Sequence, residues 1–185
     1  MIMRNFSVKK LTFTGLMAAL ICVLTMFPHI PIPAGSGYIH LGDGMILLAA
    51  MVVGPLAIPA AAIGSALADL FSGYALYAPA TAVIKGLVAL VAFAGLKGSK
   101  PFWVEWLVLI VAEAVMVLGY FLAECLMYGA ASAAGAVLPN VVQGLGGVVI
   151  GTLIGAHVFR LIPEQKFRYI VYSYIGLCGL YFCFS

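Results

Sequence analysis

Residues 41–71 read LGDGMILLAAMVVGPLAIPAAAIGSALADLF, and this stretch decides how many times the chain crosses a membrane. As a single helix rising about 1.5 Å per residue it would be about 45 Å long, well beyond a bilayer hydrocarbon core of about 30 Å. Gly54-Pro55 divides the stretch into two apolar segments. We interpret this dipeptide as a tight turn between two short membrane helices.

The composition of the whole chain supports this interpretation. Hydrophobic residues make up 65% of the 185 residues and charged residues only 8%. Soluble domains are about one quarter charged, so the composition predicts an integral membrane protein with one transmembrane domain over residues 1–185. The net charge is +3, and its basic residues lie between apolar segments instead of forming a basic patch. We therefore expect a lipid bilayer, and no nucleic acid, as a partner.

Six apolar segments predict an all-α, six-helix transmembrane bundle over about residues 11–162. They are Leu11–Phe27, Leu41–Val53, Leu56–Phe71, Ala78–Leu96, Val104–Tyr128 and Leu138–Ile162. The first could be a signal peptide, but no small-residue cleavage site follows it, so we expect a retained helix. An extra apolar segment, Tyr169–Phe184, is short for a span of about 20 residues. A seventh span, an interfacial helix and an altered C-terminus all remain open for it.

The basic residues test the assumed turn at Gly54-Pro55. Of the nine basic residues, Lys85 lies within the fourth segment, and the other eight fall before the first segment, after the fourth and after the sixth: Arg4, Lys9, Lys10, Lys97, Lys100, Arg160, Lys166 and Arg168. With the turn in place all eight lie on one side, which the positive-inside rule makes cytoplasmic together with the N-terminus. The external loops are then expected at Pro28–His40, Ser72–Tyr77 and Gly129–Pro139, none of which contains Lys or Arg.

In this topology, polar residues of five segments meet at one membrane depth on the external side. They are Asp43, Asp69, Lys85, Glu124, Asn140 and Gln143. A charge in hydrocarbon costs about 3 kcal/mol even on lenient insertion scales, so such residues must face protein, water or a ligand. Their convergence predicts a binding pocket open to the exterior. Some of the tyrosines on the same side are placed to stack on a flat heteroaromatic ligand.

Structural roles compete with this interpretation. Asp69 and Lys85 can form an ion pair that fixes packing, and Asp43 is placed to cap a helix N-terminus. Glu113 precedes Glu124 by eleven residues, which at about 100° per residue puts both carboxylates on one helix face. Glu113 would lie near mid-membrane, where we expect a polar packing contact; a proton relay is the alternative.

Small residues in the first segment indicate close helix packing. Gly15, Ala18 and Ala19 form a small-residue patch, and Gly15 and Ala19 are four residues apart. In lipid this spacing lets helices approach closely, either within the chain or against another membrane protein.

Motifs for catalysis are missing from the sequence. It contains no GxxxxGK[ST] phosphate loop, no HExxH and no GxSxG, and its cysteines have no CxxC or Cys/His spacing. We therefore expect no enzyme activity, no catalytic residues, no metal and no cofactor.

Four stretches carry a resemblance to a known family. They are Gly15-Leu-Met-Ala-Ala-Leu, Gly37-Tyr-Ile-His-Leu-Gly-Asp43, Gly64-Ser-Ala-Leu-Ala-Asp-Leu-Phe-Ser-Gly-Tyr74 and Tyr77-Ala-Pro-Ala-Thr-Ala-Val-Ile-Lys-Gly86. Through the six predicted spans the chain resembles the substrate-binding S components of energy-coupling-factor (ECF) transporters, which take up vitamins in bacteria. The resemblance ends after Pro163, because a six-helix component does not need the apolar tail.

The resemblance implies a six-helix subunit of an ABC importer in the bacterial cell membrane, with both termini inside. It implies that the subunit captures a vitamin in an outward-facing pocket and releases it after toppling in the membrane. Its implied partners are a transmembrane scaffold (T) subunit, which would dock on Gly15, Ala18 and Ala19, and two cytoplasmic ATPases. The candidate substrate-binding residues are Lys85, Tyr120, Glu124, Asn140, Gln143, His40, Tyr74, Tyr77 and Asp69.

The substrate is a further expectation from the resemblance. The stretches around His40 and Asp69 look closest to members assigned to hydroxymethylpyrimidine or vitamin B6, whereas pantothenate would use Lys85 as counter-ion. A self-sufficient proton-coupled carrier using Glu113, Asp69 and Lys85 is the alternative function. Such carriers often contain inverted repeats, which this sequence does not show.

Overall fold

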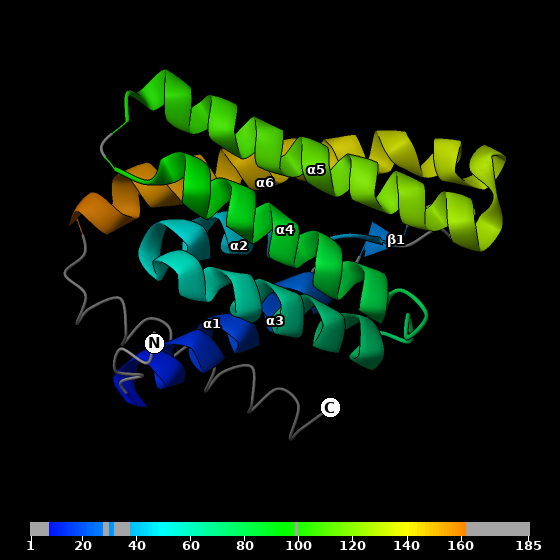
Figure 1. Cartoon of the computed structure of the whole chain (residues 1–185), viewed down its shortest axis with the longest axis horizontal. Coiled ribbons are helices and arrows are strands. Elements are labelled where there is room, and N and C mark those ends of the chain that lie inside the picture. Colours follow the sequence, from blue (N-terminus) through cyan, green and yellow to red (C-terminus); the bar gives the residue numbers. More distant parts are fainter. Residues whose placement is uncertain (1–7, 28–29, 32–37, 99, 162–185) are drawn as a thin grey trace, which may run out of the picture.

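The structure, a computed structural model, describes residues 8–27, 30–31, 38–98 and 100–161. Within these residues it contains six α-helices and one small antiparallel ribbon that pairs Ile30 with Ile39 (Figure 1). The elements are α1 (Val8–Met26), β1 (Ile30–Pro31), β2 (Tyr38–Ile39), α2 (Gly42–Val52), a 3-10 turn (Gly54–Leu56), α3 (Ala57–Phe71), α4 (Ala78–Leu96), α5 (Phe102–Tyr128) and α6 (Ala130–Leu161). The predicted all-α, six-helix architecture is confirmed. The apolar tail Tyr169–Phe184 lies outside the described residues.

The predicted turn between α2 and α3 is present. Gly54 has a φ of 62°, a left-handed conformation that glycine adopts at little cost. Pro55 follows inside the 3-10 turn, and α3 begins at Ala57. Residues 41–71 therefore form two helices, as expected.

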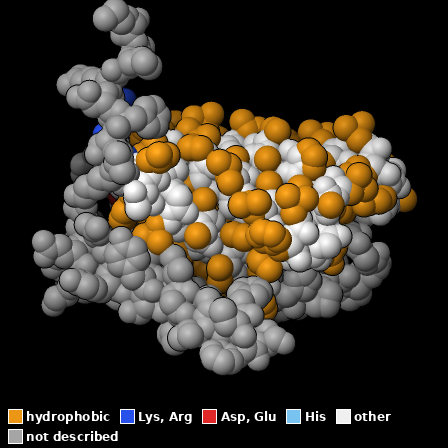
Figure 2. Space-filling view, turned by 90° about the horizontal axis from the view of Figure 1, so that it is seen from below, with side chains coloured by type: hydrophobic (Ala, Val, Ile, Leu, Met, Phe, Trp, Pro, Cys, Tyr) orange, Lys and Arg blue, Asp and Glu red, His pale blue; other side chains and the backbone are white. Residues whose placement is uncertain are grey.

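The helices differ in whether they are long enough to cross a membrane. Within the described residues, four helical segments are long and apolar enough to cross a membrane: Gly54–Phe71, Ala78–Leu96, Phe102–Tyr128 and Ala130–Leu153. Lys10–Met26 and Gly42–Val52 are shorter apolar helices. Hydrophobic side chains are spread over the whole described part of the face shown in Figure 2, as expected for a surface in contact with lipid.

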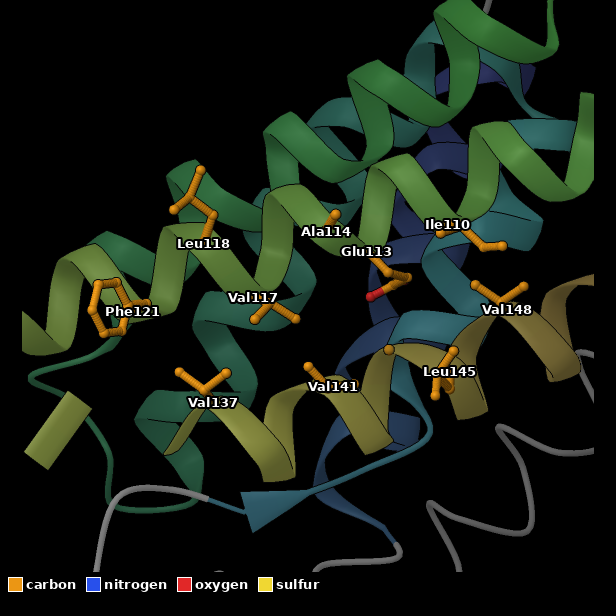
Figure 3. Close-up of a pocket in the computed structure, with 11 residues that line it drawn as sticks. Ile110, Glu113, Ala114, Val117, Leu118, Phe121, Val137, Val141, Leu145 and Val148 are labelled. Atoms are coloured by element: carbon orange, nitrogen blue, oxygen red, sulfur yellow. The ribbon is translucent and has the colours of Figure 1, made fainter. Parts of the chain in front are cut away.

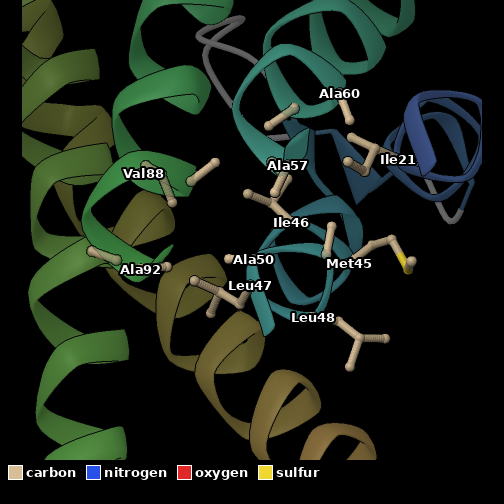
Figure 4. Packing of buried hydrophobic residues seen from close by; sticks show 14 of the residues in the cluster. Ile21, Met45, Ile46, Leu47, Leu48, Ala50, Ala57, Ala60, Val88 and Ala92 are labelled. Atoms are coloured by element: carbon tan, nitrogen blue, oxygen red, sulfur yellow. The ribbon is translucent and has the colours of Figure 1, made fainter. Parts of the chain in front are cut away.

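The short helix α2 lies at the centre of the bundle. α1, α3, α4, α5 and α6 pack in that order, each against the next, while α2 contacts α6, α4 and α1 (Figure 1). Its residues from Gly42 to Ala50 are all buried, and Ile46 and Leu47 belong to the hydrophobic core shown in Figure 4. A helix that is apolar all round must be enclosed by other elements, and α2 meets this condition.

One predicted loop is wrong. Gly129–Pro139 was expected to be an external loop, but only Gly129 makes the turn, with a φ of 88°, and α6 begins at Ala130. The residues that follow are rich in alanine, which has the highest helix propensity. Pro139 lies inside α6. Membrane helices tolerate such a proline because neighbouring groups and local adjustment satisfy the backbone it leaves unpaired.

Glycines of α6 bring this helix close to α2. A Cβ atom added at Gly147 would lie 3.0 Å from the Cβ of Asp43, and one added at Gly151 would lie 3.1 Å from the Cβ of Leu47. Gln143, Gly147 and Gly151 are four residues apart and therefore share one face of α6. This face, pressed against α2, positions the Gln143 side chain beside Asp43.

Candidate functional site

A cluster of three buried polar side chains joins α2, α4 and α6. The ammonium Nζ of Lys85 and the Oδ1 atom of Asp43 form an ion pair of 2.5 Å, and both side chains are 0% exposed. The Nε2 atom of Gln143 donates a hydrogen bond of 2.6 Å to the other carboxylate oxygen, Oδ2. We call Asp43, Lys85 and Gln143 the inner cluster. Each oxygen of Asp43 has a partner, as a charge in an apolar interior requires.

The segment that enters α2 is attached to the inner cluster. The backbone N–H of His40 donates to Oε1 of Gln143 over 3.3 Å. The N–H of Gly42 then donates to Nδ1 of His40 over 3.0 Å. His40 is thus placed by backbone and side-chain contacts next to the residues it was predicted to join.

Tyr120 of α5 covers the inner cluster. Its ring centroid lies 5.2 Å from Nζ of Lys85, within the range of a cation–π interaction. Its hydroxyl shares a hydrogen bond of 3.1 Å with the hydroxyl of Thr81. Thr81 was not among the predicted site residues, although its position four residues before Lys85 puts both on one face of α4.

Two expectations about individual carboxylates are wrong. Lys85 forms its ion pair with Asp43 and not with Asp69. Asp43 is not a helix cap, because Leu41 occupies the N-cap position of α2 and makes no side-chain cap hydrogen bond. Asp69 lies near the end of α3, where its backbone carbonyl accepts a hydrogen bond of 2.8 Å from the N–H of Tyr74. The positions along the chain do not reveal which neighbouring helix each side chain faces.

A second group of residues, which we call the outer group, lies where α4 begins and α5 ends. The ring of Tyr77 lies 6.3 Å from that of Tyr74 and 6.0 Å from that of Tyr128, centroid to centroid. Glu124 is 2% exposed. The Tyr77 hydroxyl and the Oε2 atom of Glu124 are buried and lie close enough for the two groups to interact, but no hydrogen bond of normal geometry joins either atom to a described residue. Leaving a buried polar atom without a hydrogen bond costs about 1–3 kcal/mol. A polar ligand that supplies the missing hydrogen bond removes this cost, so such atoms favour its binding.

The electrostatic surroundings keep Tyr77 in its neutral form. Burial, and next the nearby carboxylate of Glu124, raise the pKa of the Tyr77 hydroxyl above its ordinary value. Tyr77 therefore remains a hydrogen-bond donor at neutral pH.

The candidate residues occupy two levels instead of the single depth that was predicted. Tyr77 precedes Lys85 by eight residues, about 12 Å along a helix, and Glu124 lies beside Tyr77. The outer group is therefore about two turns nearer the N-terminal end of α4 than the inner cluster. Asn140 lies one turn before Gln143 on α6, towards the same end of the bundle, and is half-buried.

Glu113 does not make the polar packing contact that was expected. Both of its carboxylate oxygens are buried without a hydrogen bond to any described residue. The side chain faces α6, where Cβ atoms added at Gly144 or Gly147 would lie 3.3 Å from one of these oxygens. Within the described part of the chain, no three His, Cys, Asp or Glu side chains are grouped as a metal site.

The chain matches a known family of membrane transport proteins. The model of the family described as ECF-type riboflavin transporter, S component, matches residues 5–160. The chain belongs to this family. The S component is thus a multi-pass membrane subunit for uptake of a vitamin or vitamin precursor, and the resemblance noted from the sequence is confirmed. It is not an enzyme, and ATP hydrolysis belongs to the ATPases that act with S components and a T subunit in ECF transporters.

Individual relatives and a solved structure agree with the family. The thiamine precursor transporter HmpT of Lactococcus lactis subsp. cremoris is 34% identical over 171 residues, covering 90% of this S component and 98% of HmpT. An uncharacterised protein of Pyrococcus woesei is 38% identical over 136 residues, covering 73% and 91% of the two chains. The solved S component of a bacterial ECF transporter superposes with a TM-score of 0.69 and 24% identity, covering 82% and 96%. That structure supports the fold alone.

Proposed function

We propose that this S component captures a small hydroxymethylated heteroaromatic of the hydroxymethylpyrimidine or pyridoxine type. The observation that carries the proposal is its relationship to HmpT, which is named as a thiamine precursor transporter and aligns over 98% of its own length. Riboflavin, which appears in the description of the family, is the competing substrate.

The outer group supplies the recognition chemistry in this proposal. A carboxylate such as Glu124 accepts hydrogen bonds from the amino or hydroxyl groups of the ligand, and the Tyr77 hydroxyl donates one to a ring nitrogen. The rings of Tyr74 and Tyr77 offer aromatic surface against which a flat ring can stack. A pairing of this kind requires buried polar atoms that are not already used by the protein, which the Tyr77 hydroxyl and Glu124 Oε2 provide.

The inner cluster forms the floor of the proposed site. Lys85 and Gln143 are held by Asp43, and Tyr120 lies over the Lys85 ammonium. The other proposed contacts come from the rim: His40, Asp69 and Asn140. Pantothenate would need Lys85 as counter-ion, and the ion pair with Asp43 makes this residue less available for such a role.

We propose that the same chain docks on its T subunit through α1, with its N-terminus on the cytoplasmic side. Gly15 and Ala19 are exposed, and a Cβ atom added at Gly15 would meet no atom within 4 Å. Ala18 is half-buried, and its backbone carbonyl oxygen faces α3, where it would block a Cβ atom at Gly64. The docking proposal therefore rests on Gly15 and Ala19, while Ala18 contributes to the contact between α1 and α3.

Ligand binding tests the substrate. The purified full chain in lipid nanodiscs is titrated calorimetrically with hydroxymethylpyrimidine, pyridoxine, riboflavin and pantothenate. We expect tight binding of one of the first two and weakening by Glu124→Gln. The matched control is Glu105→Gln, which removes a carboxylate near the other end of α5. Preference for riboflavin or pantothenate, or equal effects of the two substitutions, would contradict the proposal.

Assembly tests the docking surface separately. Gly15→Leu and Ala19→Leu are expected to reduce co-purification with the T subunit and ATPases while ligand binding is kept. Gly146→Leu is the control, because Gly146 on α6 is also exposed and open. A loss of assembly in the control variant alone would place the docking surface elsewhere.

A further inference from the structure

A groove on the outside of the bundle is not used by the proposed capture site. It lies between α5 and α6, has a volume of about 440 Å³ and is lined from residues 110–121 and 137–148 (Figure 3). The eleven steps from residue 110 to residue 121 of α5 correspond to a length of about 16 Å at about 1.5 Å per residue. Leu118 and Leu145 on its walls are 57% and 56% exposed, so the groove is open towards the lipid side.

Glu113 is the acidic residue in the wall of this groove, and its other lining residues are apolar or glycine. The Glu113 side chain is 4% exposed, and both of its oxygens lack a hydrogen bond within the described residues. Room for the carboxyl is provided by Gly144, where an added Cβ would lie 3.1 Å from the Cβ of Glu113. An unpartnered carboxyl thus lies at the floor of an otherwise apolar groove.

The depth of Glu113 in the membrane limits which groups can form a hydrogen bond or an ion pair with its carboxyl. It is eleven residues from the inner end of α5 and fifteen from the outer end, or about 16 and 22 Å. The charge of Lys85 acts on Glu113, but its ammonium is already paired with Asp43. A hydrocarbon chain in the groove would leave the carboxyl without a partner, and an acidic ligand would add a like charge in a medium of low dielectric. An amine, in contrast, forms a pair with the carboxyl that is neutral overall.

We propose that the groove between α5 and α6 is a second ligand site, which binds a lipophilic amine through Glu113. The apolar body of the ligand lies along the two helices, and its amine donates hydrogen bonds to the carboxylate. The ligand enters sideways from the bilayer. Glu124 of the proposed capture site is eleven residues further along α5, about 16 Å away. The inner cluster lies nearer, because a Cβ added at Gly147 would be 3.0 Å from the Cβ of Asp43 and 3.3 Å from an oxygen of Glu113. The groove therefore opens on the lipid side of the bundle and shares a wall with the floor of the capture site.

The dimensions of the groove favour a small molecule over a helix of another protein. A partner helix would need a contact along most of a hydrocarbon core of about 30 Å, whereas the groove covers about 16 Å. Its volume of about 440 Å³ lies within the range of about 300–1,000 Å³ that is typical of small-molecule sites.

Photolabelling tests this site. The full chain in phosphatidylcholine nanodiscs is treated with dodecylamine that carries a mid-chain diazirine, and labelled peptides are located by mass spectrometry. The comparison probe is dodecanol with the same diazirine. We expect labelling of α5 and α6 peptides by the amine, blocked by unlabelled dodecylamine. The alcohol is expected to label these peptides about tenfold less, because a hydrogen bond between charged groups is lost.

Two variants separate a specific site from a loss of structure. Glu113→Gln removes the charge with little change of shape, and Val141→Trp fills the groove from its exposed wall. Both are expected to reduce amine labelling about tenfold, while Glu105→Gln keeps it. Cooperative thermal unfolding of each variant, measured independently of any vitamin, shows that the bundle is intact. Equal labelling by amine and alcohol, or full labelling of the Glu113→Gln variant, would overturn the proposal.

Discussion

Asp43 and Glu124 are two buried carboxylates in the same bundle, and they differ in what surrounds them. Asp43 binds Lys85 with one oxygen and Gln143 with the other, so three helices meet at its side chain. Glu124 lies beside Tyr77 at the ends of two helices, and its Oε2 atom has no hydrogen bond to a described residue. Polar groups whose hydrogen-bond and ion-pair partners all come from the chain stabilise the fold. Those that lack partners are where a ligand can be recognised.

The largest effect is expected at the ion pair of the inner cluster. Lys85→Met leaves the Asp43 carboxylate buried and without its cation, so the free energy of unfolding should fall by about 3–5 kcal/mol. Unfolding in detergent, followed by circular dichroism, measures this. Asp43→Asn combined with Lys85→Met removes both charges and should restore much of the loss. If the double variant is as unstable as the single one, the uncompensated charge is not the cause.

Glu124→Gln should show the opposite pattern. Loss of a charged hydrogen-bond acceptor is expected to weaken binding of the preferred ligand by about 1.5–3 kcal/mol, or about 10- to 100-fold. The unliganded protein should unfold at the same temperature or higher, because a buried carboxylate is removed. Calorimetric titration and thermal unfolding of the same sample give both values. Unchanged binding together with lower stability would show that Glu124 stabilises the fold, as Asp43 does, and does not bind the ligand.

Much of the helical layout follows from the sequence, because hydrophobic length and turn residues are local signals. The segment Ala78–Leu96 was predicted with the bounds that α4 has, and Gly54-Pro55 was identified as a turn. The start of α6 was missed because Pro139 suggested a loop, although one glycine is sufficient for the turn. Local propensity does not reveal that a proline can remain inside a membrane helix that its neighbours support.

The candidate site was less accessible to sequence reasoning for a geometric reason. Hydropathy places Lys85 about two turns into its helix, but it does not say which helices are neighbours. Asp43 became its partner because the short helix α2 lies between α4 and α6, a non-local arrangement. The sequence predicted that Lys85 and Gln143 lie close together. It did not predict that Glu124 lies at a different level of the bundle from these two residues.

Packing around Asp43 gives a smaller effect that tests how the inner cluster is positioned. Gly147→Ala places a Cβ 3.0 Å from the Cβ of Asp43, so α2 and α6 must separate slightly, at a cost of about 1–3 kcal/mol in unfolding free energy. The neighbouring substitution Gly146→Ala is the control, since an added Cβ there meets no atom within 4 Å. Thermal unfolding of the two variants under one condition measures the difference. Equal stability would mean that α2 does not need glycine at this contact.

The smallest effect is expected at Tyr77, which tests the outer group alone. Tyr77→Phe removes one hydroxyl and keeps the ring against Tyr74 and Tyr128, so ligand binding should weaken by about 0.5–1.5 kcal/mol, or about two- to tenfold. Tyr128→Phe is expected to have a smaller effect, because that side chain is 48% exposed and its hydroxyl can bind water.

The raised pKa of Tyr77 also predicts that wild-type binding shows no loss from its ionisation up to about pH 10, the ordinary tyrosine value. Calorimetric titrations at several pH values test this point. The contrary outcome is a decline in wild-type binding between neutral pH and pH 9 that is absent in Tyr77→Phe. It would show that Tyr77 ionises in this range and that the site is open to water.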